Sequence, residues 1–332
     1  MNSTQSLSPL LTKFFSERLI RQKNASHHTI SSYRDTFRLL LEYANKTLSI
    51  SPVKLLIIDI DAALIDGFLH HLEDKRGISA RSRNLRLTVI HSFFRFIAFE
   101  LPDHSGQIQQ VLAIPSKRHL KKQVNYLTRD ESETLLATTN PHHWIGRRDH
   151  AWLMLALQTG ARVSEFTALT RSDLHLGTGS YVHIVGKGRK ERCTPLTKKT
   201  KQVLQQWIKE IPQAPNQYLF PSSRGNRLSS DGVQYRLKKY VTDARIYCAS
   251  LVEKRVSPHV LRHTAAMGLL HAGVDVSVIA LWLGHESIET THIYLEADLQ
   301  MREKALAKTE PLTGSFKKFK PDDVLMNFLK SL

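Results

Sequence analysis

The first hundred residues carry apolar side chains at the spacing of an α-helix. In residues 7–21, Leu11, Phe15 and Leu19 fall on one side of such a helix. The pattern returns three times, and Ser79 stands where a serine would cap the last helix. The predicted helices span residues 7–21, 29–46, 60–75 and 79–100. We therefore expect a four-helix N-terminal domain.

The helical pattern stops near residue 101, where proline, glycine and basic residues replace it. Pro102, Gly106 and Pro115 disfavour a continuous helix, and a run of lysine and arginine follows. This composition predicts an extended linker over residues 106–125, which would follow an N-terminal domain at 1–105.

The second domain, expected over residues 126–310, combines helices with one β-hairpin. Thr128 and Glu131 form a capping box that begins its first helix. Two short β-like runs flank a Gly-Lys-Gly turn, which is typical of a hairpin. The expected helices are 150–158, 198–210, 230–244 and a helical region from 258 nearly to 306, and the expected strands are 181–185 and 192–196. The fold class is therefore mainly α with a small β-hairpin or sheet, and residues 311–332 form a separate tail.

Charge narrows the function classes further. The 332 residues, enough for two domains, include 47 basic and 30 acidic ones, which gives a net charge of +17. Such an excess favours a polyanionic partner, either nucleic acid or an anionic membrane surface. We expect neither a spanning helix, because no apolar stretch of about 18 residues is present, nor a secretory signal at residues 1–11. Cys193 and Cys248 are too few for a disulfide framework. The chain is expected to be cytoplasmic, to act on DNA and to have no membrane partner.

Basic side chains gather in the predicted N-terminal helices and the linker. A charged helix face is as often simply a solvated surface, and a basic loop can be one as well. Contact with DNA phosphates is favoured here because several helices of one small bundle contribute. The candidates are Lys23, Arg34, Arg81, Arg83, Arg86, Lys117, Arg118, Lys121 and Lys122, to which the hairpin adds Arg189 and Lys190.

Six side chains in the second domain form the candidate catalytic set. They are Arg162, Lys187, His259, Arg262, His285 and Tyr294. Arginine fits phosphate oxygens bidentately, histidine moves protons near neutral pH, and tyrosine can act as a covalent nucleophile. No cluster of carboxylates suited to magnesium accompanies them in the sequence. The set suits metal-free phosphoryl transfer through a phosphotyrosine.

Each of these residues also has an ordinary structural explanation. Arg162 could simply pair with Glu165, which stands three residues later, and a tyrosine among apolar neighbours is usually part of a core. Lys187 could be a solubilising turn residue. In the functional explanation, a lysine in this turn would reach into a DNA groove and donate a proton. Three basic neighbours compete with Lys187 for that role: Arg189, Lys190 and Arg192. Each explanation suits one residue taken alone. Together they would require six side chains suited to phosphoryl transfer to occur in this order by coincidence.

Two histidines four residues apart could be mistaken for a metal site. His259 and His263 have the spacing of ligands on one helix face, but the glutamate of the zinc-protease motif is missing from the sequence. We expect no metal there and expect His263 to pack or to cap.

Four segments carry a resemblance to a known family. The strings TGARVSE, GKGRKER, HVLRHTAA and LGHESIETTHIYLEA resemble the tyrosine recombinases of the phage integrase family, with Xer-type and transposon-borne members nearest in style. The resemblance covers about residues 10 to 300. It implies an N-terminal helical core-binding (SAM-like) domain and a mixed α/β catalytic domain, which close around DNA as a clamp.

The resemblance also implies a reaction. Tyr294 would attack the scissile phosphate, form a 3′-phosphotyrosyl link and free a 5′-hydroxyl. Arg162 and Arg262 would hold the non-bridging oxygens, and Lys187 would protonate the leaving 5′-oxygen. Because the covalent link conserves the energy of the phosphodiester, no metal, ATP or other cofactor is implied.

The remaining motif residues would support this centre. His259 would assist proton transfer at the tyrosine, His285 would hydrogen-bond the phosphate, and Glu165 would hold Arg162. The implied partners are a double-stranded DNA recombination site, further copies of the chain in a tetramer and, in some members, a partner recombinase. The tail at 311–332 is longer than the family pattern needs. It would either dock on a neighbouring protomer or be a disordered basic tail.

Two other functions stay open at this point. A type IB topoisomerase uses similar chemistry on one duplex, and a DNA-binding regulator could keep the fold without catalysis. The size and the Xer-like strings argue against the first, and the intact set of six residues argues against the second. We expect a site-specific DNA recombinase.

Overall fold

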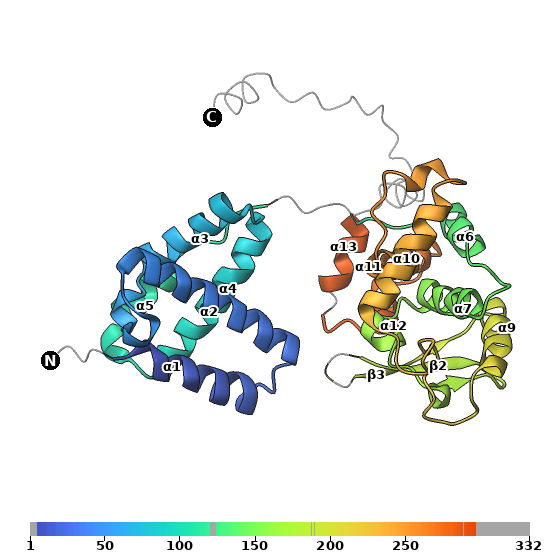
Figure 1. Cartoon of the computed structure of the whole chain (residues 1–332), viewed down its shortest axis with the longest axis horizontal. Coiled ribbons are helices and arrows are strands. Elements are labelled where there is room, and N and C mark those ends of the chain that lie inside the picture. Colours follow the sequence, from blue (N-terminus) through green and yellow to red (C-terminus); the bar gives the residue numbers. More distant parts are fainter. Residues whose placement is uncertain (1–4, 120–123, 187, 189, 288, 297–332) are drawn as a thin grey trace, which may run out of the picture. The chain divides into compact units, whose positions relative to one another are not determined.

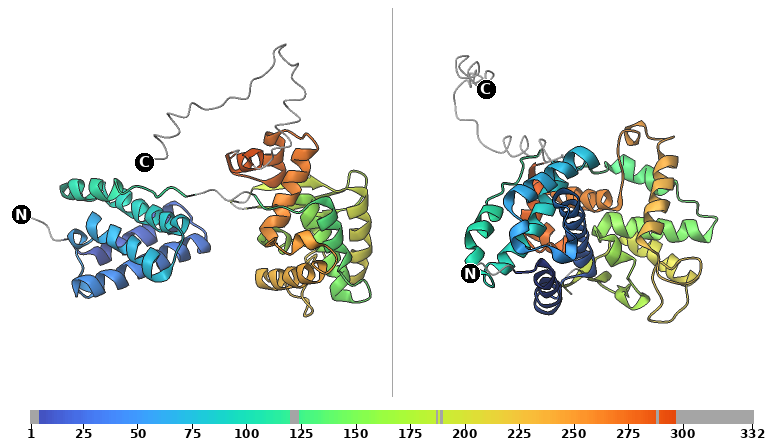
Figure 2. Two further views of the ribbon diagram at one scale, coloured as in Figure 1. Left: turned by 90° about the horizontal axis from the view of Figure 1, so that it is seen from above. Right: turned by 60° about the vertical axis from the view of Figure 1, so that its left-hand side comes forward.

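The computed structural model describes residues 5–119, 124–186, 188, 190–287 and 289–296. The chain divides into two compact units, Met1–Lys121 and Lys122–Leu332. The described part of the first unit consists of helices and connecting loops, whereas the second also contains a small sheet (Figures 1 and 2). The predicted fold class, mainly α with a small sheet, is confirmed.

The first unit is a helical bundle around an aromatic core. Phe14 and Phe37 both pack edge-on against Phe93, with ring centroids 5.4 and 5.3 Å away. Ser79 caps its helix as predicted, because its hydroxyl accepts a hydrogen bond from the Ser82 N–H. The helices are α1 (Leu7–Lys13), continued by π-helical turns at Phe14–Gln22, α2 (His27–Leu48), α3 (Ala62–Arg76), α4 (Ala80–Ile97) and α5 (Ser105–Leu112), with 3₁₀ turns at Pro52–Lys54, Ile57–Asp59 and Pro102–His104.

Helix α5 lies in the stretch where an extended linker was predicted. It buries Ile108 and Val111 in the core of the bundle. Pro102 does not prevent this, since it occupies the first position of a 3₁₀ turn, where its missing N–H has no role. Burial of two apolar side chains outweighed the weak helix propensity of Gly106, and the chain is helical as far as Leu112.

The second unit surrounds the buried helix α7 (Trp144–Thr159). Helix α9 (Lys198–Trp207) packs on one side of α7 and helix α11 (Pro258–His271) on the other (Figure 1). Trp152 of α7 stacks on Phe166 with ring centroids 5.6 Å apart. The other helices are α6 (Arg129–Ala137), α8 (Val163–Phe166), α10 (Ser230–Ala244), α12 (Val276–Leu283) and α13 (Glu289–Glu296), with 3₁₀ turns at Arg171–Asp173, Ile208–Glu210 and Ala249–Leu251.

The sheet of the second unit contains the predicted hairpin. Its strands β1 (Leu174–His175), β2 (Tyr181–Val185) and β3 (Glu191–Pro195) are antiparallel and lie in that order. The last β2–β3 pair is Val185 with Glu191, so the Gly-Lys-Gly segment follows β2 directly, as the sequence predicted.

The helical region that begins at Pro258 is divided by two glycines. Gly273 follows α11 with a φ of +81°, and Gly284 ends α12 with a φ of +65°. Glycine adopts this left-handed conformation without a Cβ clash, which makes it a common helix terminator. The predicted continuation to residue 306 and the tail at 311–332 lie outside the described residues. Among the helices that are described, none is long and apolar enough to cross a membrane.

Candidate active site

Two arginines meet where the ends of α7 and α12 approach helix α11. Arg262 of α11 is buried and donates from Nη1 to the Gly160 carbonyl and from Nη2 to the Leu283 carbonyl, each at 2.7 Å. Arg162 directly precedes α8, and its Nη1 and Nη2 lie 3.4 Å from the Gly284 carbonyl oxygen. A Cβ on Gly160 would lie 2.5 Å from the Leu283 side chain, so this close approach requires glycine.

A single buried carboxylate joins Arg162 to a second arginine, Arg192. Glu165 accepts a hydrogen bond from Nη1 of Arg162 at Oε1 and from Nη2 of Arg192 at Oε2, both at 2.7 Å. Burial alone would raise the pKa of Glu165, but the hydrogen bonds and charges of the two arginines outweigh it, and the pKa is lowered. Glu165 therefore stays ionised at neutral pH and holds both guanidinium groups.

The cluster carries an excess of positive charge. Burial, followed by the nearby charge of Arg162, lowers the pKa of Arg262 to about 10, so Arg262 is still protonated at neutral pH. Three guanidinium groups, those of Arg162, Arg192 and Arg262, thus have one carboxylate, Glu165, among them. In a partly buried site of low dielectric constant, this imbalance favours binding of an anion such as phosphate.

Tyr294 of α13 is buried beside these arginines. It is 2% exposed, and its hydroxyl oxygen lies 3.0 Å from Nδ1 of His263, within hydrogen-bond distance. Burial raises the pKa of Tyr294, and the charges of Arg262 and Arg162 partly offset that rise. Burial, with smaller contributions from His259 and Arg262, lowers the pKa of His263, so a neutral His263 can accept the hydroxyl hydrogen.

The pairing of His263 with Tyr294 was missed by sequence reasoning, which expected His263 to pack or to cap. The two residues are 31 positions apart and lie on different helices, so no local spacing joins them. The one available signal was that His263 follows Arg262 directly in the HVLRHTAA string.

His285 begins the segment after α12 and contacts α13. Its Nδ1 lies 2.7 Å from the Thr291 hydroxyl, and its ring stacks on Tyr294 at a centroid distance of 6.4 Å and an angle of 12°. Burial, followed by the charges of the three arginines, lowers the pKa of His285 to about 4. His285 is therefore a neutral hydrogen-bonding group at pH 7. His259 is exposed in the first turn of α11.

Lys187, like Arg189, lies outside the described residues. The base of its turn borders the buried carboxylate, because a Cβ on Gly186 would lie 3.1 Å from Oε1 of Glu165. The Gly186 N–H donates to the Lys190 carbonyl at 2.7 Å and closes the hairpin. Four of the six candidate catalytic residues share one neighbourhood: Arg162, Arg262, His285 and Tyr294.

The candidate phosphate contacts include one residue that the structure excludes. Arg83 is 3% exposed and donates from Nη1 to the Pro115 carbonyl at 2.7 Å, so the prediction that it contacts DNA phosphates is wrong. It precedes Leu87 and Ile90 by four and seven residues, which places it on the apolar face of α4. Arg86 is half-buried and joins α4 to α2 through the Thr36 hydroxyl at 2.7 Å.

The other candidate phosphate contacts that the structure describes are exposed. They are Lys23, Arg34, Arg81, Lys117, Arg118 and Lys190. Lys117 pairs with Glu73 across 2.6 Å, an interaction that solvent weakens at this exposed position. Lys121 and Lys122 lie outside the described residues.

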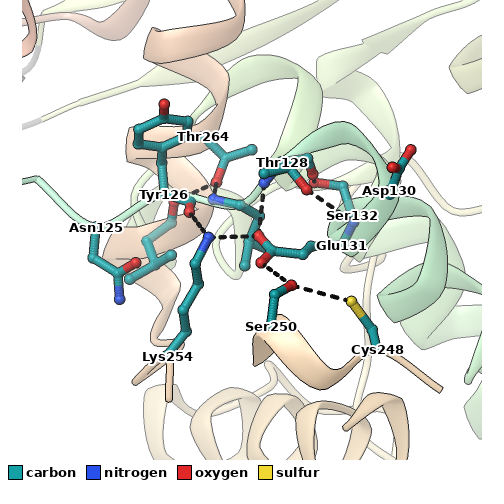
Figure 3. A network of polar contacts seen from close by, with 12 residues as sticks. Asn125, Tyr126, Thr128, Asp130, Glu131, Ser132, Cys248, Ser250, Lys254 and Thr264 are labelled. Carbon is teal, nitrogen blue, oxygen red and sulfur yellow. Dashed lines mark hydrogen bonds and ion pairs between the residues drawn. The ribbon is translucent and has the colours of Figure 1, made fainter. Parts of the chain in front are cut away.

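A polar network fixes the start of the second unit near helix α11 (Figure 3). Glu131 is 1% exposed and accepts from Lys254 Nζ at 2.7 Å, from the Ser250 hydroxyl at 2.6 Å and from the Thr128 N–H at 2.8 Å. The last of these bonds belongs to the predicted capping box, which is confirmed. Lys254 also donates to the Tyr126 carbonyl at 3.0 Å and thereby ties the preceding segment to the network.

The same segment contacts the helix that carries Arg262. The Leu127 N–H donates to the Thr264 hydroxyl of α11 at 2.9 Å. Val124 and Tyr126 pack against the small hydrophobic cluster that includes Tyr294. The chain that enters the second unit is therefore part of the packing that positions the candidate site.

We expect Glu131→Gln to lower the free energy of unfolding of the second unit by about 1–3 kcal/mol at pH 7, because hydrogen bonds to a buried charged group are lost. Burial alone would raise the pKa of Glu131, but the bonds from Lys254 and Ser250 hold it below its usual value. The difference between wild type and variant should therefore shrink as the pH falls through that lowered pKa. Urea unfolding followed by tryptophan fluorescence measures the effect.

Fluorescence reports on the second unit because it contains all four tryptophans, namely Trp144, Trp152, Trp207 and Trp282. Glu133→Gln is the matched control, since Glu133 is an exposed partner of Arg129 on the same helix. It should change the free energy of unfolding by less than about 0.5 kcal/mol. Equal losses from both substitutions would contradict a specific contribution of the buried network.

Comparison with known proteins agrees with this architecture. Residues 125–301 match the phage integrase family, and residues 12–100 match the N-terminal SAM-like domain of phage integrases. The protein y4rC of Sinorhizobium fredii is 58% identical over the whole of both chains. Tyrosine recombinase XerC of Thermodesulfovibrio yellowstonii is 30% identical over 88% of this chain and 93% of that protein.

Solved structures share the fold. The XerH site-specific recombinase bound to palindromic difH substrate superposes with a TM-score of 0.67 and 21% identity, covering 93% of this chain and 91% of that one. The Tn1549 transposon integrase in complex with circular intermediate DNA gives a TM-score of 0.68 and 16% identity, covering 92% and 100%. The chain therefore belongs to the phage integrase family of tyrosine recombinases and is a site-specific DNA recombinase.

Proposed function

We propose that the chain cleaves and rejoins double-stranded DNA through a 3′-phosphotyrosyl intermediate at Tyr294, without metal or ATP. The observation that carries this proposal is a buried tyrosine hydroxyl within the electrostatic influence of Arg162 and Arg262. A phosphate bound here would meet positive charge and a nucleophile in one water-poor site. Two alternatives are a type IB topoisomerase and a catalytically silent DNA-binding regulator. Membership of the tyrosine recombinase family supports recombination better than either of them.

The two arginines would hold the non-bridging oxygens of the scissile phosphate. The side chain of Arg162 is 28% exposed, so its guanidinium is accessible to a ligand from one side. Arg262 is more deeply buried, but each of its terminal nitrogens uses one hydrogen for a backbone carbonyl and retains another. Both charges would stabilise the oxygens as negative charge develops on them.

The proton transfers follow from the groups around the hydroxyl. As Oη of Tyr294 forms its bond to phosphorus, its proton would move to His263, with His259 assisting from the rim. The bond to the 5′-oxygen breaks, and that oxygen takes a proton from Lys187, whose role rests on the family resemblance. Because Nδ1 of His285 faces Thr291, its Nε2 would be available to the phosphate.

Strand exchange would complete the reaction. The 5′-hydroxyl of a partner duplex would attack phosphorus and give its proton to Lys187. The bond between phosphorus and Oη of Tyr294 would break, and Oη would take back the proton held by His263. Four protomers would assemble on two duplexes, either alone or with a partner recombinase, and the exposed basic residues named above would contact the DNA backbone.

The test uses a plasmid that carries two copies of a DNA site recovered from trapped covalent adducts. In EDTA and without ATP, the chain should delete or invert the segment between the two sites. Relaxation of any supercoiled plasmid, with no preference for the site, would instead support a topoisomerase. DNA binding without either product would support a regulator.

Deletion of residues 311–332 is expected to weaken assembly on DNA. Residues 324–329 contain a short apolar face in the sequence, which would suit a groove on a neighbouring protomer. Native electrophoresis with site DNA measures the fraction of higher-order complexes. As a control, glutamine at Lys317, Lys318 and Lys320 removes charge from the tail and should leave those complexes in place. Normal complexes and normal recombination after the deletion would contradict docking of the tail.

A further inference from the structure

We propose that Arg192 is a positioning residue for the cleavage reaction. Its guanidinium group holds Glu165 and Arg162 against the segment that carries His285. The inference rests on the function proposed above for Arg162 and His285. The sequence alone makes Arg192 a competitor of Lys187 for the role of proton donor. The structure gives it a different setting, on the inner side of the hairpin.

The strand register directs Arg192 into the second unit. Arg192 pairs with Ile184 of β2, and cross-strand partners project from the same face of a sheet. Ile184 is fully buried, and the side chain of Arg192 is 10% exposed. At that depth the guanidinium acts within the site and is a poor candidate for direct contact with a DNA groove.

Arg192 completes the fixation of the shared carboxylate. Oε1 of Glu165 accepts from Arg162, whereas Oε2 accepts from Arg192 at 2.7 Å and from the Arg162 backbone N–H at 3.0 Å. The last torsion of a glutamate side chain is intrinsically broad, so a carboxylate that loses the shorter of the two hydrogen bonds to one oxygen has more freedom to rotate. Removal of Arg192 would therefore loosen the group that orients Arg162.

The other face of the Arg192 guanidinium contacts the segment after α12. A Cβ on Gly284 would lie 2.8 Å from Nη1 and 3.4 Å from Cζ of Arg192, so the guanidinium packs directly on this backbone. The Gly284 carbonyl also lies 3.4 Å from Arg162, and the next residue is His285. Arg192 and Arg162 thus hold one short backbone segment from two sides.

Fold stability alone does not explain this arrangement. Nε of Arg192 is buried and has no hydrogen-bond partner within the described part of the chain. A buried donor without an acceptor disfavours folding. The gain from Arg192 is instead expected in the geometry of the site, where a small misplacement of a reacting group can cost about 100-fold in activity.

Arg192→Met is expected to slow single-turnover cleavage of the trapped DNA site by about 10- to 100-fold, while the dissociation constant for that DNA stays near the wild-type value. Arg192→Lys keeps the charge but loses the planar group that spans Glu165 and Gly284. Its cleavage rate should therefore lie between those of wild type and Arg192→Met. Glu165→Gln should also slow cleavage. The double variant Arg192→Met, Glu165→Gln should lose less activity than the product of the two single losses, because both changes remove the shared contact between Arg192 and Glu165.

Arg171→Met is the matched control, since Arg171 is a half-buried arginine of the same unit that donates to the Ile208 carbonyl. It should cleave at the wild-type rate. Wild-type cleavage by Arg192→Met, additive losses in the double variant, or an equal loss of DNA binding would each overturn the inference. If tryptophan fluorescence shows that Arg192→Met is unfolded, Arg192→Lys and its double variant with Glu165→Gln replace it. The same three measurements then test the inference: the cleavage rate, the additivity of the losses and the dissociation constant for DNA.

Arg162→Ala separates this inference from the proposed function. If Arg162→Ala abolishes cleavage and Arg192→Met does not affect it, the inference about Arg192 fails by itself. If Arg162→Ala also cleaves normally, the proposed function fails.

Discussion

Tyr294→Phe is expected to abolish the covalent DNA adduct and to leave DNA binding nearly unchanged. The substitution removes the hydroxyl oxygen that would bond to phosphorus and keeps the buried ring in its cluster. The hydroxyl has one described hydrogen-bond partner, His263, so the free energy of unfolding should fall by about 1 kcal/mol. The loss of adduct therefore cannot be attributed to unfolding.

The measurement is an SDS-resistant adduct assay with nicked fragments of the source genome, without metal or ATP. Tyr126→Phe is the matched control, because Tyr126 packs against the same hydrophobic cluster as Tyr294. The Tyr126→Phe protein is expected to form the adduct as wild type does. An adduct formed by Tyr294→Phe would contradict the assignment of the nucleophile. If wild type also forms no adduct while it binds DNA tightly, a regulator or an enzyme that requires a partner becomes the better explanation.

Arg262→Lys is expected to reduce the cleavage rate by about 10²- to 10³-fold, the loss typical of removing one preorganised donor to a developing charge. The two terminal nitrogens of Arg262 reach the carbonyls of Gly160 and Leu283 at the same time. A lysine has one nitrogen and cannot span both carbonyls while it also faces a phosphate. The defect should therefore appear in the cleavage step as well as in the packing of the two helix ends.

Single-turnover cleavage and a DNA-binding isotherm, measured on the same preparation, distinguish these effects. Arg255→Lys provides the control, since Arg255 is an exposed arginine in the segment before α11. Tryptophan fluorescence in urea reports whether Arg262→Lys remains folded. Cleavage at the wild-type rate by a folded Arg262→Lys protein would contradict the proposed contact between Arg262 and the phosphate.

Several parts of the fold were predictable because they depend on residues close together in the chain. The Ser79 cap, the Thr128–Glu131 capping box and the hairpin that begins with β2 each involve a few neighbouring residues. The position of Gly284 at a helix end follows from the backbone freedom of glycine. The Arg162–Glu165 pair spans one helical turn, so its spacing alone indicated it.

The apolar face of α4 held information that the prediction of a basic surface overlooked. Arg83 follows the periodicity of Leu87 and Ile90, and that periodicity indicates burial. Similarly, the spacing of Ile108 and Val111 favours a helical turn in a stretch that proline and glycine marked as linker. In both cases a compositional signal was preferred to a periodic one, and burial of apolar surface decided the structure.

The sequence by itself determined most of the helices, the hairpin and the order of motif residues that identifies the family. The tertiary structure alone decided that the Tyr294 hydroxyl meets His263, that Arg192 shares Glu165 with Arg162, and that Arg262 joins two helix ends. These contacts join residues 21 to 102 positions apart. Periodicity shows which face of an element is buried, but the partner of that face depends on how all the elements pack together.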